Sequence, residues 1–139
     1  MKIDGANILV TGGCGLIGST TIEQLLLRHN PARIVILDNL VRGSLANVTQ
    51  VLNDPRVSLV RGDIRDRTAV ERAMQGVDVV IHTAAALPLY KPEDIYSTDI
   101  DGLRMVLDVA FANKIERVVH ISSTAVYGIP DHHPLLETD

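Results

Sequence analysis

The segment ILVTGGCGLIGS at residues 8–19 carries the residue types and spacing best suited to chemistry. An apolar run leads into a glycine cluster and then into a helical pattern. A diphosphate needs several backbone N–H groups at close range, and the first turn of a helix supplies them without side chains in the way when glycines precede it. The run predicts a dinucleotide-binding turn, in one of two registers: residues 13–18 as G-x-G-x-x-G, or Gly12, Gly15 and Gly18 as G-x-x-G-x-x-G. A glycine-rich turn of another kind is the alternative.

Asp38 supplies the context that this motif requires. It follows Gly18 by 20 residues and lies at the end of the apolar run RIVILD. A carboxylate at that place accepts hydrogen bonds from the hydroxyls of an adenosine ribose and repels a 2′-phosphate. The spacing therefore favours NAD over NADP, although Arg42 nearby weakens the preference. An ordinary loop aspartate is the alternative reading of Asp38.

Composition bounds what the elements around these residues can build. The chain has 139 residues, 46% of them hydrophobic, and a net charge of −4, which fits one α/β domain with a real core and leaves no room for a second. No basic patch indicates a nucleic-acid partner, and no long apolar segment indicates a signal peptide or a membrane span. We expect a cytoplasmic protein. The only cysteine, Cys14, is expected to fill space in the glycine turn and not to act as a nucleophile.

Strand-like and helix-like patterns alternate along the chain, which is typical of a parallel sheet covered on both faces. The strand-like runs are residues 6–11, 33–38, 57–60, 77–82 and 117–122. The helical patterns are residues 16–28, 44–51, 67–74 and 92–113. In the last pattern, apolar residues at helical spacing are expected to cover the sheet, namely Ile100, Leu103, Val106, Leu107, Ala110 and Phe111. These elements predict a Rossmann-type, doubly wound α/β fold with five parallel strands in the order 3-2-1-4-5.

In such a sheet, ligands bind beyond the carboxyl ends of the strands. After the third strand, Asp63 is placed to accept from an adenine amino group and Ile64 to pack on the ring. N-capping of the next helix is the alternative role for Asp63, but Asp66 suits that task better. After the fourth strand, the small residues 83–86 would let the cofactor pass close to the backbone, unless they form a plain tight turn.

Three hydroxyl groups follow the fifth strand, on Ser122, Ser123 and Thr124. They would lie at the mouth of the cleft, where a hydroxyl can hold a substrate. Hydroxyls at strand ends also commonly cap backbone groups, and the three residues alone leave both roles open.

Together these segments resemble the extended short-chain dehydrogenases/reductases, specifically the NAD-dependent epimerases and dehydratases that act on sugar nucleotides. The resemblance rests on TGGCGLIGS, LDNLVRGS, RGDIRD, VIHTAAA, STDIDGLRMVLDVA and ISSTAVYG, which occur in family order. It favours the register of Gly12, Gly15 and Gly18. The resemblance implies NAD binding by Gly12, Gly15, Leu16, Ile17, Asp38, Asn39, Arg42, Gly43, Asp63, Ile64, Ala84, Ala85 and Ser122.

The resemblance also implies that Ser123, three residues before Val126, would hydrogen-bond the reacting oxygen of the substrate. Thr124 would be its neighbour. Two departures from the family pattern stand out. Asp99 occupies the place of a common asparagine, so an acceptor-only carboxylate replaces an amide. The family's catalytic tyrosine, with lysine four residues later, is expected beyond Asp139, because Tyr127 belongs to V-Y-G and is followed four residues later by Asp131.

We therefore expect residues 1–139 to be the amino-terminal, NAD-binding portion of a longer enzyme, with further strands and the substrate domain outside it. Alone, this portion should not turn over. A hydroxysteroid or flavanol dehydrogenase of the same family, and a non-catalytic dinucleotide-sensing module, are the alternative functions. A nucleotide sugar is the expected partner, and residues 92–113 are the candidate homodimer interface by resemblance.

No metal site is predicted. Adjacent histidines rarely bind one ion, so residues 131–133 are expected to form a solvated loop. His82 and His120 are expected to be core or edge histidines and not catalytic bases.

Overall fold

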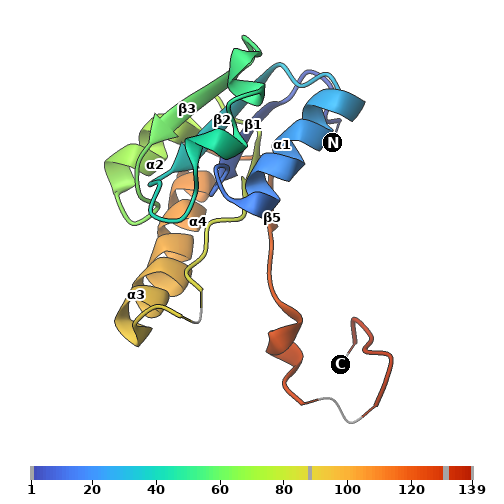
Figure 1. Cartoon of the computed structure of the whole chain (residues 1–139), viewed down its shortest axis with the longest axis vertical. Coiled ribbons are helices and arrows are strands. Elements are labelled where there is room, and N and C mark those ends of the chain that lie inside the picture. Colours follow the sequence, from blue (N-terminus) through green and yellow to red (C-terminus); the bar gives the residue numbers. More distant parts are fainter. Residues whose placement is uncertain (1, 88, 130–131, 139) are drawn as a thin grey trace.

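The structure is a computed structural model that describes residues 2–87, 89–129 and 132–138. Its centre is a fully parallel five-stranded sheet in the order β3-β2-β1-β4-β5, as predicted (Figure 1). The break in sequence order between β1 and β4 is the switch point where a doubly wound sheet binds its ligand. The strands are β1 (Asn7–Thr11), β2 (Arg33–Asp38), β3 (Val57–Arg61), β4 (Val79–His82) and β5 (Arg117–His120).

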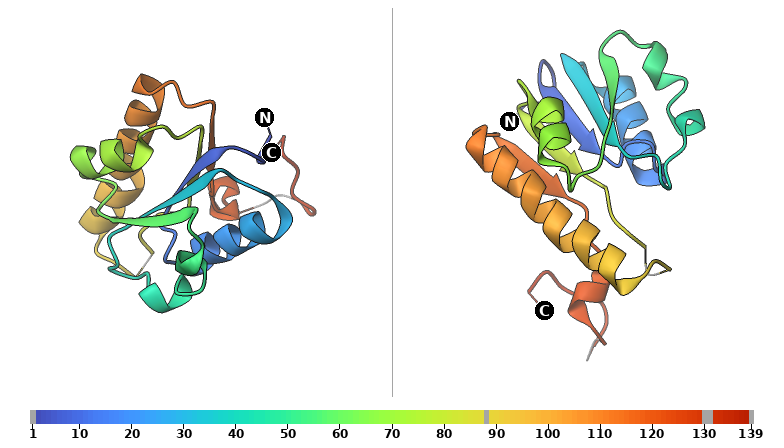
Figure 2. Two further views of the ribbon diagram at one scale, coloured as in Figure 1. Left: turned by 90° about the horizontal axis from the view of Figure 1, so that it is seen from above. Right: turned by 90° about the vertical axis from the view of Figure 1, so that its left-hand side faces the viewer.

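Helices cover both faces of the sheet (Figure 2). The helices predicted at residues 16–28 and 67–74 have the predicted bounds. Asp66 caps the helix at 67–74 by accepting from the Thr68 N–H, as expected. The short pattern at 44–51 forms two 3₁₀ turns instead of one helix. The helical elements are α1 (Leu16–Arg28), η1 (Leu45–Asn47), η2 (Val51–Asn53), α2 (Arg67–Met74), α3 (Pro92–Tyr96), η3 (Ser97–Gly102), α4 (Leu103–Ala112) and η4 (Thr124–Tyr127).

Alternation along the central strands builds two cores. Ile8 and Val10 of β1 pack with Ile22 of α1 on one face. Leu9, between them in sequence, faces the other side and packs with Val70 of α2 and other residues of α2 and α4. Neighbouring residues of a strand point to opposite faces, so a strand with both faces covered becomes apolar throughout.

The long helical region at 92–113 departs from the expected packing. Its middle is a π-helical turn, η3, in an otherwise α-helical run. Val106 and Ala110 face the sheet as predicted, together with Val109. Ile100, Leu107 and Phe111 do not cover the sheet, and Phe111 is 88% exposed. The sequence pattern merged two apolar stripes of one helix, and a helix can turn only one of them toward the sheet.

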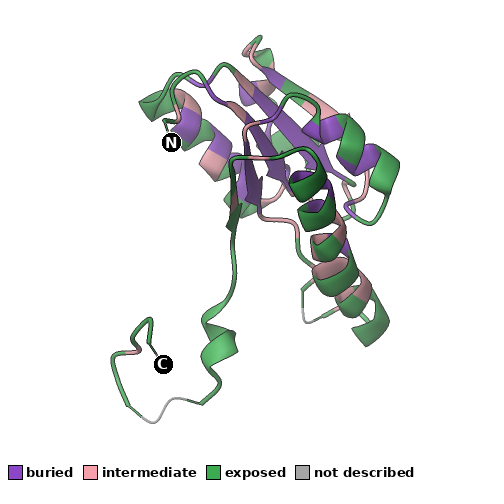
Figure 3. Ribbon diagram, turned by 180° about the vertical axis from the view of Figure 1, so that it is seen from behind, coloured by how far each residue is buried: buried purple, intermediate pink, exposed green. Residues whose placement is uncertain are grey.

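The last part of the chain is much more exposed than the sheet (Figure 3). In β5 only Val118 is partly buried, whereas every residue of β4 is buried. Residues 121–129 are all exposed and lead away from the sheet. Among the helices of the described ranges, none has the length and apolarity to cross a membrane.

Candidate functional site: a dinucleotide-binding cleft

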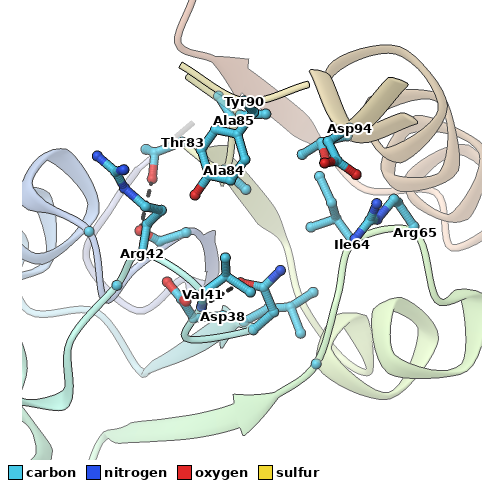
Figure 4. Close-up of a pocket in the computed structure, with 18 residues that line it drawn as sticks. Asp38, Val41, Arg42, Ile64, Arg65, Thr83, Ala84, Ala85, Tyr90 and Asp94 are labelled. Carbon is cyan, nitrogen blue, oxygen red and sulfur yellow. Dashed lines mark hydrogen bonds between the residues drawn. The ribbon is translucent and has the colours of Figure 1, made fainter. Parts of the chain in front are cut away.

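A pocket opens at the carboxyl ends of the strands, on both sides of the switch point between β1 and β4 (Figure 4). Asp38 and Val41 border it on the β2 side, and Ala84, Ala85 and Tyr90 on the β4 side. Of the predicted cofactor residues, the pocket is lined by Gly12, Gly15, Asp38, Asn39, Arg42, Gly43, Ile64, Ala84 and Ala85.

The glycine turn has the geometry of the Gly12, Gly15, Gly18 register. Gly12 has φ +69°, and a Cβ there would lie 2.7 Å from the backbone N and Cα of Ala84. A Cβ at Gly18 would collide with the Gly12 carbonyl oxygen where helix and turn touch. Gly13 instead faces the core, because its Cβ would lie 2.8 Å from a methyl group of Ile36.

The first turn of α1 is available to a ligand. Gly15 is the N-cap residue and brings no side chain to the helix end. Leu16 and Ile17 follow it with exposed side chains, and the first N–H groups of a helix have no partner within it. Neither residue lines the pocket through its side chain, so any contribution to phosphate binding comes from backbone N–H groups.

Asp38 ties the glycine turn to the end of β2. Its buried carboxylate accepts from the Cys14 N–H (2.9 Å, Oδ2) and from the Leu40 N–H (2.8 Å, Oδ1). Cys14 itself is buried, and burial with the nearby Asp38 charge raises the pKa of its thiol to about 11. A buried thiol with a raised pKa is a poor nucleophile, which agrees with the space-filling role predicted for Cys14.

A second carboxylate, on Asp63, lies in a network beside this pocket. Arg65 donates to it three times, from its backbone N, from Nε and from Nη2, at 2.8–2.9 Å. The Asn39 amide adds a fourth hydrogen bond at 3.0 Å. The Arg65 hydrogen bonds, above all, hold the pKa of Asp63 well below its usual range, although partial burial opposes them. The carboxylate is therefore an anion held in one orientation at the end of β3.

Arg65 also reaches across the pocket to the helix that follows β4. Its Nη1 donates to the Ser97 hydroxyl at 3.0 Å. Ile64 is buried beside it, and a Cβ on Gly102 would lie 2.7 Å from the Ile64 side chain. These contacts join the β3–α2 loop to the π-helical turn.

Small residues line the pocket where the chain leaves β4. The Thr83 hydroxyl donates to the Thr11 carbonyl oxygen at 2.7 Å, which fixes the chain as it leaves the strand. Ala84 and Ala85 follow with side chains too small to obstruct a ligand. The Ala86 N–H donates to Asp99 at 2.7 Å. This contact needs only an acceptor, so the aspartate found in place of the family's asparagine can make it.

His82 supports this loop from below and does not line the pocket. It is buried, its Nδ1 lies 2.8 Å from the Thr11 hydroxyl, and its ring stacks on the exposed His120 of β5 at 5.4 Å. Burial, with a smaller effect of His120, lowers the pKa of His82 to about 4. Both histidines have the core and edge positions predicted for them.

Several pocket residues were not predicted. Arg65 stands inside the RGDIRD motif, so the motif itself could have indicated it. Tyr90, Asp94 and Thr98 come from the region after β4, where no spacing signal marks a wall of the pocket. Arg42 lies over the Tyr90 ring, with its guanidinium carbon 5.7 Å from the ring centre. This cation–π pair joins the β2 and β4 sides of the pocket.

The predicted substrate hydroxyls lie elsewhere. Ser122, Ser123 and Thr124 are exposed in the segment after β5 and do not line the pocket. Ser123 caps η4, because its hydroxyl accepts from the Ala125 N–H at 3.2 Å. Asp131 of the predicted solvated loop lies outside the described residues. Within those residues, no group of three His, Cys, Asp or Glu side chains is arranged to hold a metal ion.

Three features define this as a Rossmann-type dinucleotide-binding domain. They are a glycine turn at a helix N-terminus, a carboxylate at the end of β2, and a passage at the switch point lined by small residues. These residues fit a dinucleotide, because the N-cap glycine of α1, the Asp38 carboxylate and the small residues Ala84 and Ala85 all line one pocket. The sequence profile of the NAD dependent epimerase/dehydratase family matches residues 8–139, and the chain belongs to that family. NAD is the cofactor of the family.

Known relatives agree with this assignment. The chain is 36% identical to the dTDP-glucose 4,6-dehydratase of Streptomyces antibioticus, an alignment that covers 93% of this chain and 42% of the relative. It is 35% identical to the UDP-glucose 4-epimerase of Streptococcus mutans, over 94% of this chain and 40% of the relative. The chain spans 30%, 42% and 36% of the length of three curated relatives it matches.

Solved structures of the family superpose on nearly the whole chain. DesIV, a dTDP-glucose 4,6-dehydratase from Streptomyces venezuelae solved with NAD and TYD bound, has a TM-score of 0.83 and 36% identity. The superposition covers 93% of this chain and 43% of DesIV. Epimerase Mth375 from Methanothermobacter thermautotrophicus has a TM-score of 0.88 and 31% identity, over 99% of this chain and 41% of that protein.

Proposed function

We propose that residues 1–139 form the NAD-binding portion of a sugar-nucleotide epimerase or dehydratase. The observation that carries the proposal is the glycine turn of α1 facing both the Asp38 carboxylate and the Ala84–Ala85 passage around one pocket. The relatives named as dTDP-glucose 4,6-dehydratase and UDP-glucose 4-epimerase support the substrate class, a nucleoside-diphosphate hexose.

In this proposal each wall of the pocket has one task. The N–H groups of the first turn of α1 hold the diphosphate, Asp38 accepts from the adenosine ribose hydroxyls, and Asp63 with Ile64 holds the adenine. Asn39, Arg42 and Gly43 surround the ribose. The nicotinamide end then lies along Ala84 and Ala85. Bound NAD supplies a reversible acceptor for hydride, and the protein's part is to orient it and keep the passage clear.

We also propose that this chain alone does not complete the reaction. Removing a carbinol proton at neutral pH needs a base with a lowered pKa, which a tyrosine with a nearby lysine provides. The three tyrosines here, Tyr90, Tyr96 and Tyr127, are followed four residues later by Asp94, Ile100 and Asp131. Ser123 and Thr124 would orient a substrate oxygen and Ser122 would approach the cofactor, but none of these hydroxyls is a base for that proton.

Titration of the purified chain tests the proposal in two steps. NAD should bind with a measurable heat in calorimetry, and Asp38→Asn should weaken the binding about tenfold because a charged acceptor for the ribose is lost. Asp78→Asn, a carboxylate change at the opposite end of the sheet, is the matched control. UDP-glucose or dTDP-glucose incubated with NAD and the chain should remain unchanged by chromatography. Failure to bind NAD contradicts the first step, and epimerised or dehydrated product contradicts the second.

We further propose a homodimer through residues 92–113. The outward apolar side chains Leu107 and Phe111 of α4 support it, since exposed large apolar residues on one helix mark an interaction surface. Light scattering should give twice the mass of the 15.1 kDa chain, and Phe111→Ser should return it to the monomer.

A further inference from the structure

Asp99 does not itself line the pocket, but its carboxylate is hydrogen bonded to Ala86, which lines the pocket on the side that the proposed function gives to the nicotinamide. Asp38 marks the adenosine end at β2, so a dinucleotide crossing the switch point must place its other end over β4. The loop after β4 enters the pocket through Ala84, Ala85 and Ala86. Asp99 is joined to this loop directly, by the 2.7 Å hydrogen bond from the Ala86 N–H.

The backbone around Asp99 holds the carboxylate there. It lies in the π-helical turn η3, a local widening that often accompanies functional sites in helices. Thr98, immediately before Asp99, lines the pocket. Gly102, at the end of the turn, packs against the Ile64 side chain. The hydrogen bond engages Oδ1, and no cation of the described residues forms an ion pair with Asp99. Its charge is therefore held near the pocket without a neutralising partner in that part of the structure.

From this placement we infer that Asp99 makes the site select the oxidised cofactor over the reduced one, an inference that rests on the proposed function. The nicotinamide ring of NAD⁺ carries a positive charge, and addition of hydride makes the ring neutral. A fixed negative charge beside the ring attracts the first form and acts weakly on the second. Asp38 and Asp63 lie at the adenosine end, which is identical in both forms, and so do not discriminate between them.

Replacing the carboxylate at position 99 with an amide tests the role of its charge alone. An asparagine at position 99 would offer the same carbonyl oxygen to the Ala86 N–H but no charge. Asp99→Asn therefore separates the electrostatic role from the structural one. Asp101→Asn is the matched control, because Asp101 lies in the same turn and pairs with Arg104 at 3.8 Å.

The test measures the ratio of the NADH and NAD⁺ dissociation constants for three proteins. The chain has no tryptophan, so NADH binding can be followed by its own emission and NAD⁺ binding by competition. Asp99→Asn should reduce the preference for NAD⁺ about fivefold, the size of a Coulomb interaction between partly solvated charges, mostly by weakening NAD⁺ binding. Asp101→Asn should leave the ratio within about twofold of the unchanged chain.

The outcomes separate the two claims. An unchanged ratio in Asp99→Asn, or an equal loss of both affinities, overturns the inference while dinucleotide binding itself stands. At 1 M salt, the ratio of dissociation constants measured for the unchanged chain should move toward the ratio measured for Asp99→Asn. This result would support an effect of charge, because salt screens it. If the unchanged chain binds neither NAD⁺ nor NADH, the proposed function fails and the inference fails with it.

Discussion

The two sides of the pocket are built to different degrees of order. On the β2 and β3 side, Asp38 and Asp63 each have their orientation set by two or more hydrogen-bond donors. Beyond β4, the next strand is exposed along most of its length, and the exposed Ser123 caps η4 by accepting from the Ala125 N–H. The β2 and β3 side is preorganised, whereas β5 and the segment after it form an open surface.

This difference indicates how the fold divides its work. Binding a common cofactor fragment requires fixed donors and acceptors, which short loops between buried strands provide. Choosing and converting a substrate requires groups from several other segments. The arrangement accounts for a family whose relatives share this portion while their names give different reactions.

The largest effect on stability should come from substituting alanine for one glycine in the ordered part of the site, compared with one in the open segment after β5. Gly12 and Gly128 have the same φ of +69°, but a Cβ at Gly12 would lie 2.7 Å from Ala84 whereas nothing lies within 4 Å of one at Gly128. Gly12→Ala should lower the free energy of unfolding by about 4 kcal/mol and abolish NAD binding. Gly128→Ala meets no such clash and should cost about 2 kcal/mol, because φ +69° with ψ −145° is a backbone conformation that essentially only glycine adopts. Urea unfolding followed by circular dichroism measures both, and equal losses would refute the contrast.

The two histidines on β4 and β5 offer a second test of the difference between buried and exposed parts of the molecule. His82 and His120 are register partners on adjacent strands, but only His82 is buried. The folded-state pKa of His82, about 4, lies below its unfolded value of 6.5, so the unfolded chain binds more protons between these values. Stability should therefore fall by about 3 kcal/mol as the pH drops from 7 to about 4.

Variants assign that pH dependence. His82→Gln should flatten the unfolding free energy between pH 4 and 6.5, while His29→Gln, at an exposed site beside Asp4, should keep the slope. Asp63 gains stability from its lowered pKa only above its unfolded value and loses it at still lower pH, which keeps it out of this window. A slope that persists in His82→Gln would assign the effect to another group.

The sequence predicts those features of the fold that depend on residues within one helix or strand and its flanks. The bounds of α1 and α2 follow from periodicity with a glycine or aspartate at the helix start, and the strand order follows from alternating elements. The choice between the stripes of Val106 and Leu107 on α4 depended on the rotation of the whole helix about its axis, which packing against the sheet sets. No local pattern encodes that rotation.

The site shows the same limit. Glycine spacing and the place of Asp38 predict a pocket because both belong to a motif with fixed spacing along one strand–helix–strand unit. The tie from Arg65 to Ser97, and the wall made by Tyr90 and Thr98, join segments about 30 to 60 residues apart. Such contacts depend on how side chains meet after folding, which sequence spacing does not reveal.

A smaller effect should come from the ion pair between Arg65 and Asp63. Arg65→Ala removes the two side-chain hydrogen bonds to Asp63, from Nε and Nη2, and the one to Ser97, while the backbone N–H of residue 65 and the Asn39 amide still donate to Asp63. The change should cost about 1 kcal/mol of stability, since the pair is partly exposed and screened. It should also weaken NAD binding about fivefold. Arg67→Ala, which breaks only the exposed pair with Glu71, should change stability by less than about 0.5 kcal/mol and leave NAD binding unchanged. Equal effects would mean that Arg65 is an ordinary surface charge.

The smallest effect is expected on the open side. The Ser123 hydroxyl accepts from the Ala125 N–H of an exposed turn, and the backbone carbonyl of residue 123 keeps its own hydrogen bond from Val126 N–H when the hydroxyl is removed. Ser123→Ala should therefore change the unfolding free energy by less than about 0.5 kcal/mol. NAD affinity should change by less than about twofold, because the hydroxyl does not line the pocket. Calorimetry and urea unfolding measure the two quantities, with Ser44→Ala, a similar cap on η1 of the β2 side, as the matched comparison. A clear loss of NAD affinity in Ser123→Ala would show that the segment after β5 folds back onto the cofactor, and the two sides would then act as one site.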